Sequence, residues 1–506
     1  MSIRLRDHAG SLSLSLPRLV ISAPRGRSGK TSLSIGLCAA LSRHGLSVQP
    51  FKKGPDYIDP SWLTAAARRP CRNLDLFIMG AERLVTAFLQ AGQGADLALI
   101  EGAMGLYDGL DLEGSASTAQ VARLLKAPVI LVVDATRMTR SAAALVQGFQ
   151  SFEPDVNIAG VVLNNVAQAR HEAKLTAALR HYCGIEVLGA LPRDPTLTIP
   201  QRHLGLVPRG EHESVPFHLS LFDPGHSSTN GGRSQIFDPA IEALRQAVET
   251  HVDLDGVLSV AQGAPPLSGG FLAEAPPALN PSGTADSPSV RIGVAMDRAF
   301  TFYYPANLEA LRVAGADLTP VDTLRDRDLP PVDGLYLGGG FPEVFCEELE
   351  ASEALRSQIR AAIEDGLPVY AECGGLMYLA RSIVWNGRRR RMVGTLPCDI
   401  EMTDRPQGHG YVSLRVTGQN PWFRAGAELR GHEFHNSRVT NLGDIEFAYR
   451  LQRGRGVAGG YDGLVYKNVL AAYTHLHTLG APGWAAQFVG LAKMHRSTNT
   501  FQPSSH

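Results

Sequence analysis

Residues 367–376 read Leu-Pro-Val-Tyr-Ala-Glu-Cys-Gly-Gly-Leu, an apolar run that stops at Cys373 and gives way to two glycines and an apolar helical pattern. A sharp strand-to-helix turn of this kind exposes the side chain at its tip above a sheet, and the glycines leave backbone N–H groups facing an oxyanion. The stretch therefore predicts an α/β layer fold with Cys373 as a nucleophile. A buried, inert cysteine is the alternative, and the two glycines disfavour it.

A second diagnostic stretch lies far upstream. Residues 26–31 read Gly-Arg-Ser-Gly-Lys-Thr, follow the apolar run 19–21 and precede a helical pattern at 32–42. This order of strand, glycine-rich turn and helix predicts a phosphate-binding loop. Pro24 stands where the strict pattern has a glycine, so the match is incomplete, and a Gly/Ser turn before an ordinary helix is the alternative.

The loop contains the residue types that nucleotide binding needs. Its glycines let backbone N–H groups wrap a phosphate, its lysine reaches the outer phosphates, and its threonine hydroxyl can hold Mg²⁺. The candidate ATP-binding residues here are Gly26, Gly29, Lys30 and Thr31. Carboxylates that follow two further strand-like runs can supply oxygen ligands for a hard cation. They are Asp56, Asp59, Glu101 and Asp108.

Composition narrows the class of protein. The chain has 506 residues, which favours two or three domains, and its net charge of −1 gives no reason to expect nucleic acid as a partner. Six cysteines without paired or metal-type spacing fit a reducing, cytoplasmic location. Residues 1–17 are too short and polar for a signal peptide or a membrane span, so no membrane association is expected.

Near-continuous apolar runs predict a parallel sheet covered on both faces in the first half of the chain. The clearest are residues 48–51, 97–100, 129–133 and 159–163. A second α/β pattern begins at residue 290, after a stretch rich in Pro, Gly and Ala. The predicted organisation is a flexible tail at 1–17, an ATP-binding domain at 18–260, a linker at 261–289, a second domain at 290–495 and a flexible tail at 496–506.

Residues 51–60, 101–109 and 202–206 resemble the synthetase half of the cobyrinate (or hydrogenobyrinate) a,c-diamide synthases, a family similar in fold to dethiobiotin synthetase. The resemblance implies a P-loop NTPase-like domain that uses ATP and Mg²⁺. The implied roles are metal binding for Thr31, Asp56 and Glu101, phosphate transfer or substrate binding for Asp59 and Asp108, and adenine contact for Asn164. Lys53 and Trp62 depart from the family pattern near the presumed acceptor pocket.

The second half resembles the same family, with a class I glutamine amidotransferase-like α/β domain. Residues 335–343 form a strand that ends in a glycine loop, so Gly340, together with Gly374, is a candidate oxyanion donor. His475 aligns with the family's catalytic histidine, which would hold Cys373 as a thiolate. The usual His-x-Glu is His-Leu-His here, which implies a Cys–His dyad whose ring is oriented by a water or a backbone carbonyl.

Some basic and histidine residues keep more than one interpretation. His432 and His435 fit either a hydrogen-bonded turn or a surface that faces substrate, and metal ligation is the less favoured reading. Four arginines at 388–391 favour a solvated hairpin arm over a nucleic-acid patch. Carboxylates of a substrate could be bound by Arg69, Arg72 and Arg202.

The resemblance implies ATP- and glutamine-dependent amidation of the a and c acetates of a corrin-type tetrapyrrole, through an acyl phosphate, in cobalamin biosynthesis. Two alternatives stay open: amidation of another tetrapyrrole such as sirohydrochlorin or sirohaem, and a P-loop switch protein with an inactive amidotransferase-like scaffold. The expected partners are glutamine and a tetrapyrrole polycarboxylate, and assembly as a homodimer is left open.

Overall fold

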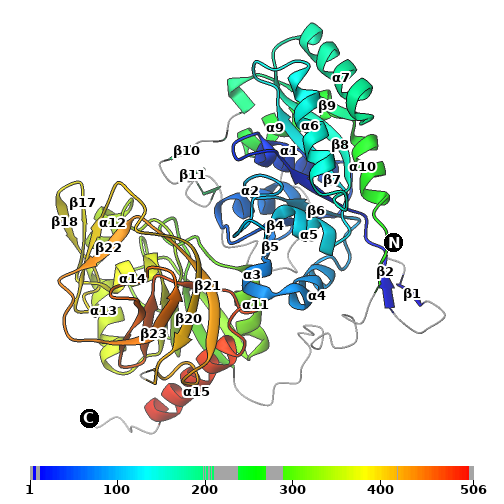
Figure 1. Ribbon diagram of the computed structural model, residues 1–506. Helices are drawn as coiled ribbons and strands as arrows, with labels where there is room; N and C mark the ends of the chain where they lie inside the picture. Colours follow the sequence, from blue (N-terminus) through cyan, green and yellow to red (C-terminus); the bar gives the residue numbers. More distant parts are fainter. Residues whose placement is uncertain are drawn as a thin grey trace. The chain divides into compact units, whose positions relative to one another are not determined.

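The computed structural model describes residues 4–6, 12–197, 199, 201–202, 205–206, 208–209, 238–268, 289–418 and 420–500. Within these residues the chain divides into two compact units, one holding the described residues up to 268 and the other holding those from 289 to 500 (Figure 1). Each unit is an α/β fold, as the sequence predicts.

The first unit is built on a seven-stranded sheet in which every neighbouring pair is parallel. Its order is β5-β4-β6-β3-β7-β8-β9. The chain thus reverses its direction across the sheet beside β3 and β6, and the carboxyl ends of parallel strands at such a reversal are where ligands bind. The strands are β3 (Arg18–Ser22), β4 (Val48–Lys53), β5 (Arg72–Leu74), β6 (Leu97–Glu101), β7 (Val129–Asp134), β8 (Ile158–Val166) and β9 (Val187–Pro192).

Helices cover this sheet, which explains why its strands are apolar along nearly their whole length (Figure 1). The first helix, α1, packs against α2 and α9 and begins at Lys30, so the predicted phosphate loop leads directly into it. The helices are α1 (Lys30–Arg43), α2 (Ile58–Ala67), α3 (Leu76–Met79), α4 (Ala81–Ala91), α5 (Thr118–Leu124), α6 (Ser141–Phe152), α7 (Ala169–Cys183), η1 (Pro195–Leu197), α9 (Pro239–His251) and α10 (Leu254–Gln262).

The second unit has a ten-stranded mixed sheet of order β14-β13-β15-β16-β25-β24-β23-β20-β21-β26. Its first five strands are parallel, and the rest pair antiparallel. The strands are β13 (Val290–Ala295), β14 (Ala316–Val321), β15 (Gly334–Leu337), β16 (Val369–Glu372), β20 (Gly408–Val416), β21 (Glu428–His435), β23 (Glu446–Arg453), β24 (Tyr461–Tyr466), β25 (Val469–Ala472) and β26 (His475–Leu476).

The antiparallel half of this sheet must curl back on itself. Only Tyr473 and Thr474 separate β25, in the middle of the sheet, from β26, which pairs with β21 at its end. In that pairing His432 and His475 are direct partners. The curl therefore brings β21 to the segment that follows the parallel strands.

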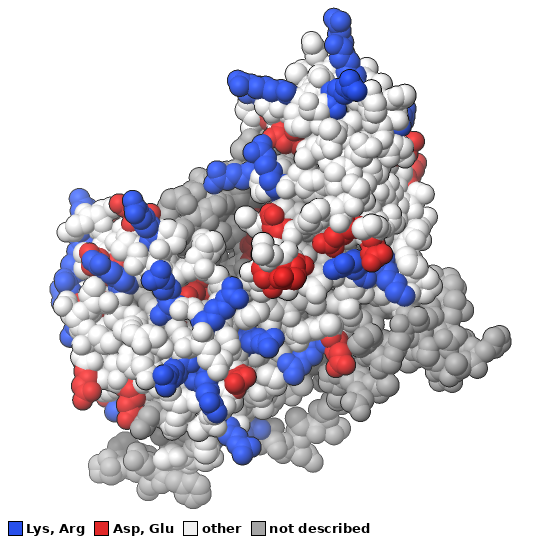
Figure 2. Space-filling view, viewed as in Figure 1, with Lys and Arg blue, Asp and Glu red and all other residues white. Residues whose placement is uncertain are grey.

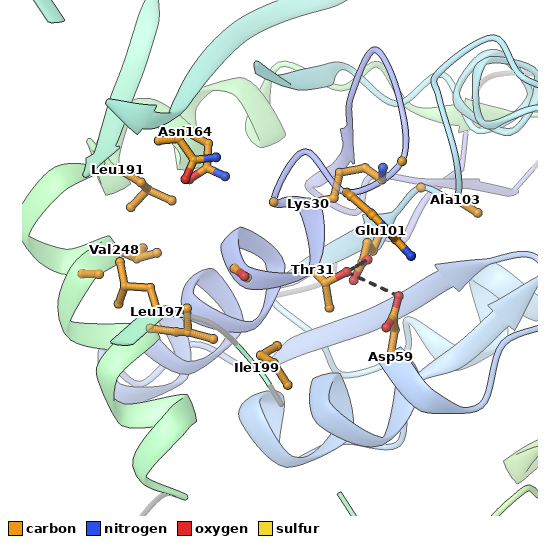
Figure 3. Close-up of a pocket in the computed structure, with 18 of the residues that line it drawn as sticks. Lys30, Thr31, Asp59, Glu101, Ala103, Asn164, Leu191, Leu197, Ile199 and Val248 are labelled. Carbon is orange, nitrogen blue, oxygen red and sulfur yellow. Dashed lines mark hydrogen bonds between the residues drawn. The ribbon is translucent and has the colours of Figure 1, made fainter. Parts of the chain in front are cut away.

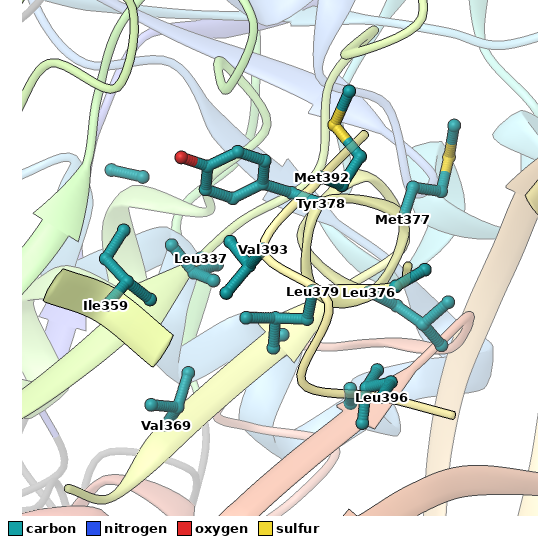
Figure 4. Close-up of a cluster of buried hydrophobic side chains, with 14 of the residues drawn as sticks. Leu337, Ile359, Val369, Leu376, Met377, Tyr378, Leu379, Met392, Val393 and Leu396 are labelled. Carbon is teal, nitrogen blue, oxygen red and sulfur yellow. The ribbon is translucent and has the colours of Figure 1, made fainter. Parts of the chain in front are cut away.

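The strand–turn–helix predicted at Cys373 is confirmed. Strand β16 ends at Glu372 and helix α14 (Gly374–Leu379) begins one residue beyond Cys373. Figure 4 shows the α14 side chains Leu376, Met377, Tyr378 and Leu379 within a buried apolar cluster, which anchors the turn. The other helices of the unit are α11 (Pro305–Val313), α12 (Cys346–Ala351), α13 (Glu353–Glu364) and α15 (Trp484–Thr500).

The four arginines at 388–391 lie in a hairpin, as predicted. Strands β17 (Ser382–Trp385) and β18 (Arg388–Arg391) pair antiparallel within a four-stranded sheet that also contains β19 (Asp399–Met402) and β22 (Ser437–Thr440). Arg390 forms ion pairs with Glu347 and Glu350. On the face shown in Figure 2, acidic and basic side chains both occur on the surface of each unit.

Regular elements also occur near the ends of the predicted domains. Strands β1 (Arg4–Arg6) and β2 (Leu12–Leu14) lie within the segment 1–17, and β2 pairs with β12 (Leu267–Ser268), which lies within the segment 261–289. Helix α15 extends through Thr500. Residues 210–237, 269–288 and 501–506, which include parts of the predicted linker and C-terminal tail, lie outside the described residues.

A short antiparallel pair, β10 (Gln201–Arg202) and β11 (Gly205–Leu206), completes the described elements. In the part of the chain that the structure describes, no helix combines the length and the apolar character that crossing a membrane would require.

Candidate active sites

A cavity of about 540 Å³ lies in the first unit where β3, β6 and the start of α1 meet (Figure 3). This volume suits a small-molecule ligand. Most of the residues predicted for the ATP and metal site line it: Gly26, Gly29, Lys30, Thr31, Asp56, Asp59, Glu101 and Asn164. The structure thus brings together segments far apart in the sequence, as the phosphate-loop interpretation requires.

Thr31, Glu101 and Asp59 form the polar centre of this pocket (Figure 3). The Thr31 hydroxyl donates to Glu101 Oε1 at 2.7 Å and lies 3.4 Å from Asp59 Oδ2. Glu101 Oε2 is buried and has no hydrogen-bond partner. Such an unpaired buried carboxylate oxygen beside a hydroxyl fits a hard cation.

Among the described residues, no three His, Cys, Asp or Glu side chains are arranged to hold a metal ion by themselves. Mg²⁺ commonly uses one or two protein carboxylates together with water and substrate phosphates. The arrangement of Thr31, Glu101 and Asp59 is therefore compatible with Mg²⁺ that arrives with a nucleotide.

Lys52 is the residue of this pocket that the sequence analysis missed. Its Nζ lies 2.8 Å from Glu101 Oε1, 2.5 Å from Asp59 Oδ2 and 3.7 Å from Asp56 Oδ2. Burial disfavours the ammonium form, but Asp59, Glu101 and Asp56 outweigh it and raise the pKa of Lys52 well above its ordinary value. Its position at the carboxyl end of a strand, beside the predicted carboxylates, was the available signal.

The electrostatics of the other pocket residues follow from burial. Burial, with a smaller contribution from Lys52, lowers the pKa of Lys30 to about 8. Burial raises the pKa of Glu101 to about 7, against the effect of Lys52. For Asp59 the neighbouring Lys52 outweighs burial and lowers the carboxyl pKa. The pocket therefore holds ionisable groups whose pKa values are shifted by burial and by one another, which is common at functional sites.

Two carboxylates have positions that differ from their predicted roles. Asp56 Oδ1 accepts the backbone N–H groups of Ile58 and Asp59, so Asp56 caps helix α2, and Asp59 rather than Asp56 faces Thr31. Asp108 is exposed and does not line the cavity. Its Oδ2 accepts the N–H of Gly105 at 2.7 Å and so holds the loop that follows β6.

Asn164, on strand β8, contacts the phosphate loop. Its Nδ2 donates to the carbonyl of Ser28 at 3.0 Å, so its amide supports the loop. An apolar wall lies nearby, which suits the flat face of a base. This wall comes from segments that carry no local motif, and the sequence analysis missed it: Leu191, Leu197, Ile199, Leu244 and Val248.

Arg69 and Trp62 have structural contacts within the first unit. The Arg69 guanidinium donates to Gln49 Oε1 and Ser47 Oγ and to the carbonyls of Ala91 and Gln93. Trp62 is 1% exposed and packs in the core of the first unit. Neither lines the cavity, and neither do two other residues singled out for the same region, Lys53 and Arg72. The Arg202 side chain lies outside the described residues.

In the second unit, Cys373 adopts the strained geometry of a nucleophile at a sharp turn. Its φ of 46° and ψ of −97° are rare for a residue with a side chain. The flanking structure fixes this conformation, because the Cys373 N–H donates to the Ala472 carbonyl at 2.7 Å and the Met377 N–H donates to the Cys373 carbonyl at 3.0 Å. Such strain is typical of functional positions.

The two predicted oxyanion donors lie next to each other. A Cβ added at Gly374 would lie 3.1 Å from the backbone N of Gly340. A Cβ at Gly339 would come 2.5 Å from Cε1 of His475, so the glycine loop also touches the imidazole. The N–H of Gly338, in the same loop, donates to the Tyr303 hydroxyl at 2.8 Å.

His475 is buried and faces a carboxylate. Its Nδ1 lies 3.6 Å from Oε2 of Glu372, the residue directly before Cys373. A water or a backbone carbonyl was predicted at this place, because the residue two positions after the histidine is not a carboxylate. A carboxylate on another strand, β16, cannot be recognised from local spacing.

Burial affects the ionisation of the predicted nucleophile. Cys373 is 5% exposed, and burial, followed by the Glu343 carboxylate, raises the pKa of its thiol well above the ordinary value. This direction does not favour the thiolate expected for the free protein. It favours transfer of the thiol proton to the imidazole as the sulfur attacks.

His432 and His435 are both buried, which favours the hydrogen-bonded interpretation. The His432 ring stacks on His475 with centroids 4.9 Å apart, and its Nδ1 lies 3.3 Å from the Tyr304 hydroxyl. His435 Nδ1 donates to the Ser437 carbonyl at 2.8 Å.

Comparison with known proteins covers nearly the whole chain. The CobQ/CobB/MinD/ParA nucleotide binding domain matches residues 19–207, and the CobB/CobQ-like glutamine amidotransferase domain matches residues 291–482. "Cobyrinate a,c-diamide synthase" of Magnetococcus marinus is 48% identical over 93% of this chain and 96% of its own length. The enzyme of that name from Methanosarcina acetivorans is 40% identical over 97% and 98%.

Proposed function

Because the chain belongs to the cobyrinate a,c-diamide synthase family, with glutamine-dependent amidation in cobalamin biosynthesis as its function, we propose that its two sites divide this reaction between them. The first unit activates a carboxylate with ATP, and the second releases ammonia from glutamine. The observation that carries the proposal is the strained turn at Cys373 together with a glycine loop, residues 338–340, that approaches both Gly374 and the imidazole of the buried His475, because a switch protein with an inactive scaffold has no use for it.

In the first unit, the acetate oxygen of the tetrapyrrole attacks the γ-phosphorus of ATP, and ADP leaves. The product is an acyl phosphate, which replaces the poor leaving group of a carboxylate. Lys30 and the glycine loop hold the phosphates, and Thr31, Glu101 and Asp59 would hold Mg²⁺. Bound Mg²⁺ would neutralise the charge that develops on the transferred group.

Lys52 adds a fixed positive charge at this site. It neutralises part of the charge on Glu101 and Asp59 while the pocket is without a nucleotide. This arrangement offsets the mutual repulsion of the carboxylates when they are buried together.

In the second unit, the Cys373 thiol gives its proton to His475 as the sulfur attacks the side-chain carbonyl of glutamine. Backbone N–H groups at Gly340 and Gly374 stabilise the oxyanion. Collapse of the intermediate breaks the C–N bond, and His475 returns the proton to the departing ammonia. Water then hydrolyses the thioester to glutamate, and ammonia displaces phosphate from the acyl phosphate to give the amide.

The substrate is tested with a panel of macrocycles. Cobyrinate, hydrogenobyrinate and sirohydrochlorin are each incubated with ATP, Mg²⁺ and glutamine, and the mass change for replacement of –OH by –NH₂ is followed. We expect two successive amidations of cobyrinate, at the a and c acetates, and we expect its other carboxyl groups to stay unchanged. Amidation of sirohydrochlorin without amidation of cobyrinate would contradict the proposal.

A further inference from the structure

We propose that Glu372 is a positioning residue that orients His475 and stabilises its protonated ring during glutamine hydrolysis. The inference rests on the proposed function, because it assigns a task within the same glutaminase centre. It concerns a residue that directly precedes the nucleophile in sequence and is 1% exposed.

The carboxylate of Glu372 is held firmly in one place. Oε1 accepts hydrogen bonds from the Tyr370 hydroxyl at 3.0 Å and from the Leu476 N–H at 2.9 Å. Oε2 accepts one from the Tyr336 hydroxyl at 3.2 Å. These three donors fix the position of the carboxylate, and the bond to Leu476 ties it to the residue that follows His475.

The second contact of Oε2 is the imidazole itself. His475 Nδ1 lies 3.6 Å from Glu372 Oε2, so a proton on Nδ1 faces the carboxylate. This tautomer leaves Nε2 as the ring nitrogen that exchanges a proton with sulfur or with ammonia. The carboxylate also favours the positive ring that forms when Cys373 gives up its proton.

The position two residues after His475 does not supply this charge. It is occupied by His477, whose Nδ1 accepts the Leu479 N–H at 3.1 Å and whose ring packs edge-on against Tyr304. Glu372 supplies a carboxylate from a different strand. The carboxylate that orients the ring thus belongs to the strand that ends before Cys373, and not to the segment that contains His475.

The other titratable neighbours of His475 do not replace it. His432 stacks on the ring from β21, and burial, followed by His475 and His477, lowers the pKa of His432 well below its ordinary value, so it is neutral. Burial raises the pKa of the Cys373 thiol, which does not favour its thiolate. Of Glu372, His432, His477 and Cys373, therefore, Glu372 is the one carboxylate.

A purely structural role is the competing explanation, because the carboxylate also joins two tyrosines to β26. Two substitutions separate the explanations. Glu372→Gln keeps the shape and removes the charge, whereas Glu372→Asp keeps the charge and shortens the side chain. A positioning role requires Glu372→Asp to be the more active variant, and a packing role requires the reverse.

The experiment measures glutaminase kcat and KM for glutamine on the full chain, together with ammonia-dependent amidation of cobyrinate as a check on folding. We expect Glu372→Gln to lower kcat by roughly 10²- to 10⁴-fold, as loss of general acid–base assistance does, with KM for glutamine and the ammonia-dependent rate unchanged. Glu372→Asp should recover part of kcat. Glu364→Gln, at an exposed position, is the matched control and should match the parent.

A parent-like kcat in Glu372→Gln would overturn the inference, and so would greater activity of that variant than of Glu372→Asp. If Glu372→Gln loses ammonia-dependent amidation as well, the variant is misfolded, and the result for Glu372→Asp then tests the inference. A parent-like KM for glutamine with a measurable kcat in Glu372→Asp supports the positioning role. A raised KM with an unchanged kcat opposes it. Cys373→Ala is assayed in parallel. If it keeps glutaminase activity, the proposed function itself fails, which separates that failure from failure of the inference.

Discussion

The substitution Gly340→Ala tests the oxyanion site most sharply, because the structure gives the displacement that it would force. An added Cβ would lie 2.9 Å from the carbonyl carbon of Ala299 and closer still to its oxygen, whereas carbon atoms pack at about 3.5 Å or more. The loop must therefore move by about 0.6 Å at least. Oxyanion donors act over a range of only about 0.4 Å, from 2.7 to 3.1 Å, so the Gly340 N–H would leave its position.

We expect Gly340→Ala to lower glutaminase kcat by about 10²- to 10³-fold, equivalent to about 2.7–4 kcal/mol of transition-state stabilisation. Ammonia-dependent amidation should be unchanged, because it does not use this loop. The matched control is Gly490→Ala in α15, where an added Cβ would meet nothing within 4 Å. A steady-state glutaminase assay that finds parent-like kcat in Gly340→Ala would refute the assignment of the oxyanion donor.

Three further substitutions or reactions test other parts of the account. Glu101→Gln removes a carboxylate that faces Thr31, so the Mg²⁺ concentration needed for half-maximal amidation should rise. Glutaminase activity measured without ATP should stay unchanged. An Mg²⁺ dependence equal to the parent's would contradict the cation site. Arg69→Ala removes four hydrogen bonds of a guanidinium that does not line the pocket. Denaturant unfolding should therefore show a free energy of unfolding lower by about 1.5–3 kcal/mol, with KM for cobyrinate unaltered. A raised KM would instead identify Arg69 as a substrate ligand. Iodoacetamide should label Cys373 more slowly in native than in urea-unfolded protein at neutral pH, because the raised pKa keeps the thiolate scarce. The labelling rate of the native protein should still increase at pH values above the ordinary thiol pKa. Equal rates for native and unfolded protein, measured by peptide mass spectrometry, would contradict this.

Local sequence was sufficient where the chemistry depends on neighbouring residues. The loop before α1 and the turn at Cys373 each combine a strand, glycines and a helix within a dozen residues, and both were predicted with their functional side chains. Glu101 was also predicted, because it follows the apolar run 97–100 and opens a glycine-rich segment, and in the structure it is the last residue of β6.

Sequence was insufficient where the site depends on tertiary pairing. Lys52 faces three carboxylates, and Glu372 faces His475, but neither relation follows from spacing along the chain. Arg69 is a further example, because the hydrogen bonds that its guanidinium donates to the carbonyls of Ala91 and Gln93 cannot be deduced from the sequence. Burial in the folded chain, which raises the pKa of Cys373, is likewise invisible in the motif.

The most direct test of the central claim compares the two nitrogen sources in Cys373→Ala. The claim is that ammonia released at this sulfur amidates an acid activated by ATP in the other unit. With cobyrinate, ATP and Mg²⁺, we predict that the variant forms no amide from glutamine and forms it from ammonium chloride at the parent's rate. Formation of the diamide from glutamine by Cys373→Ala would contradict the account.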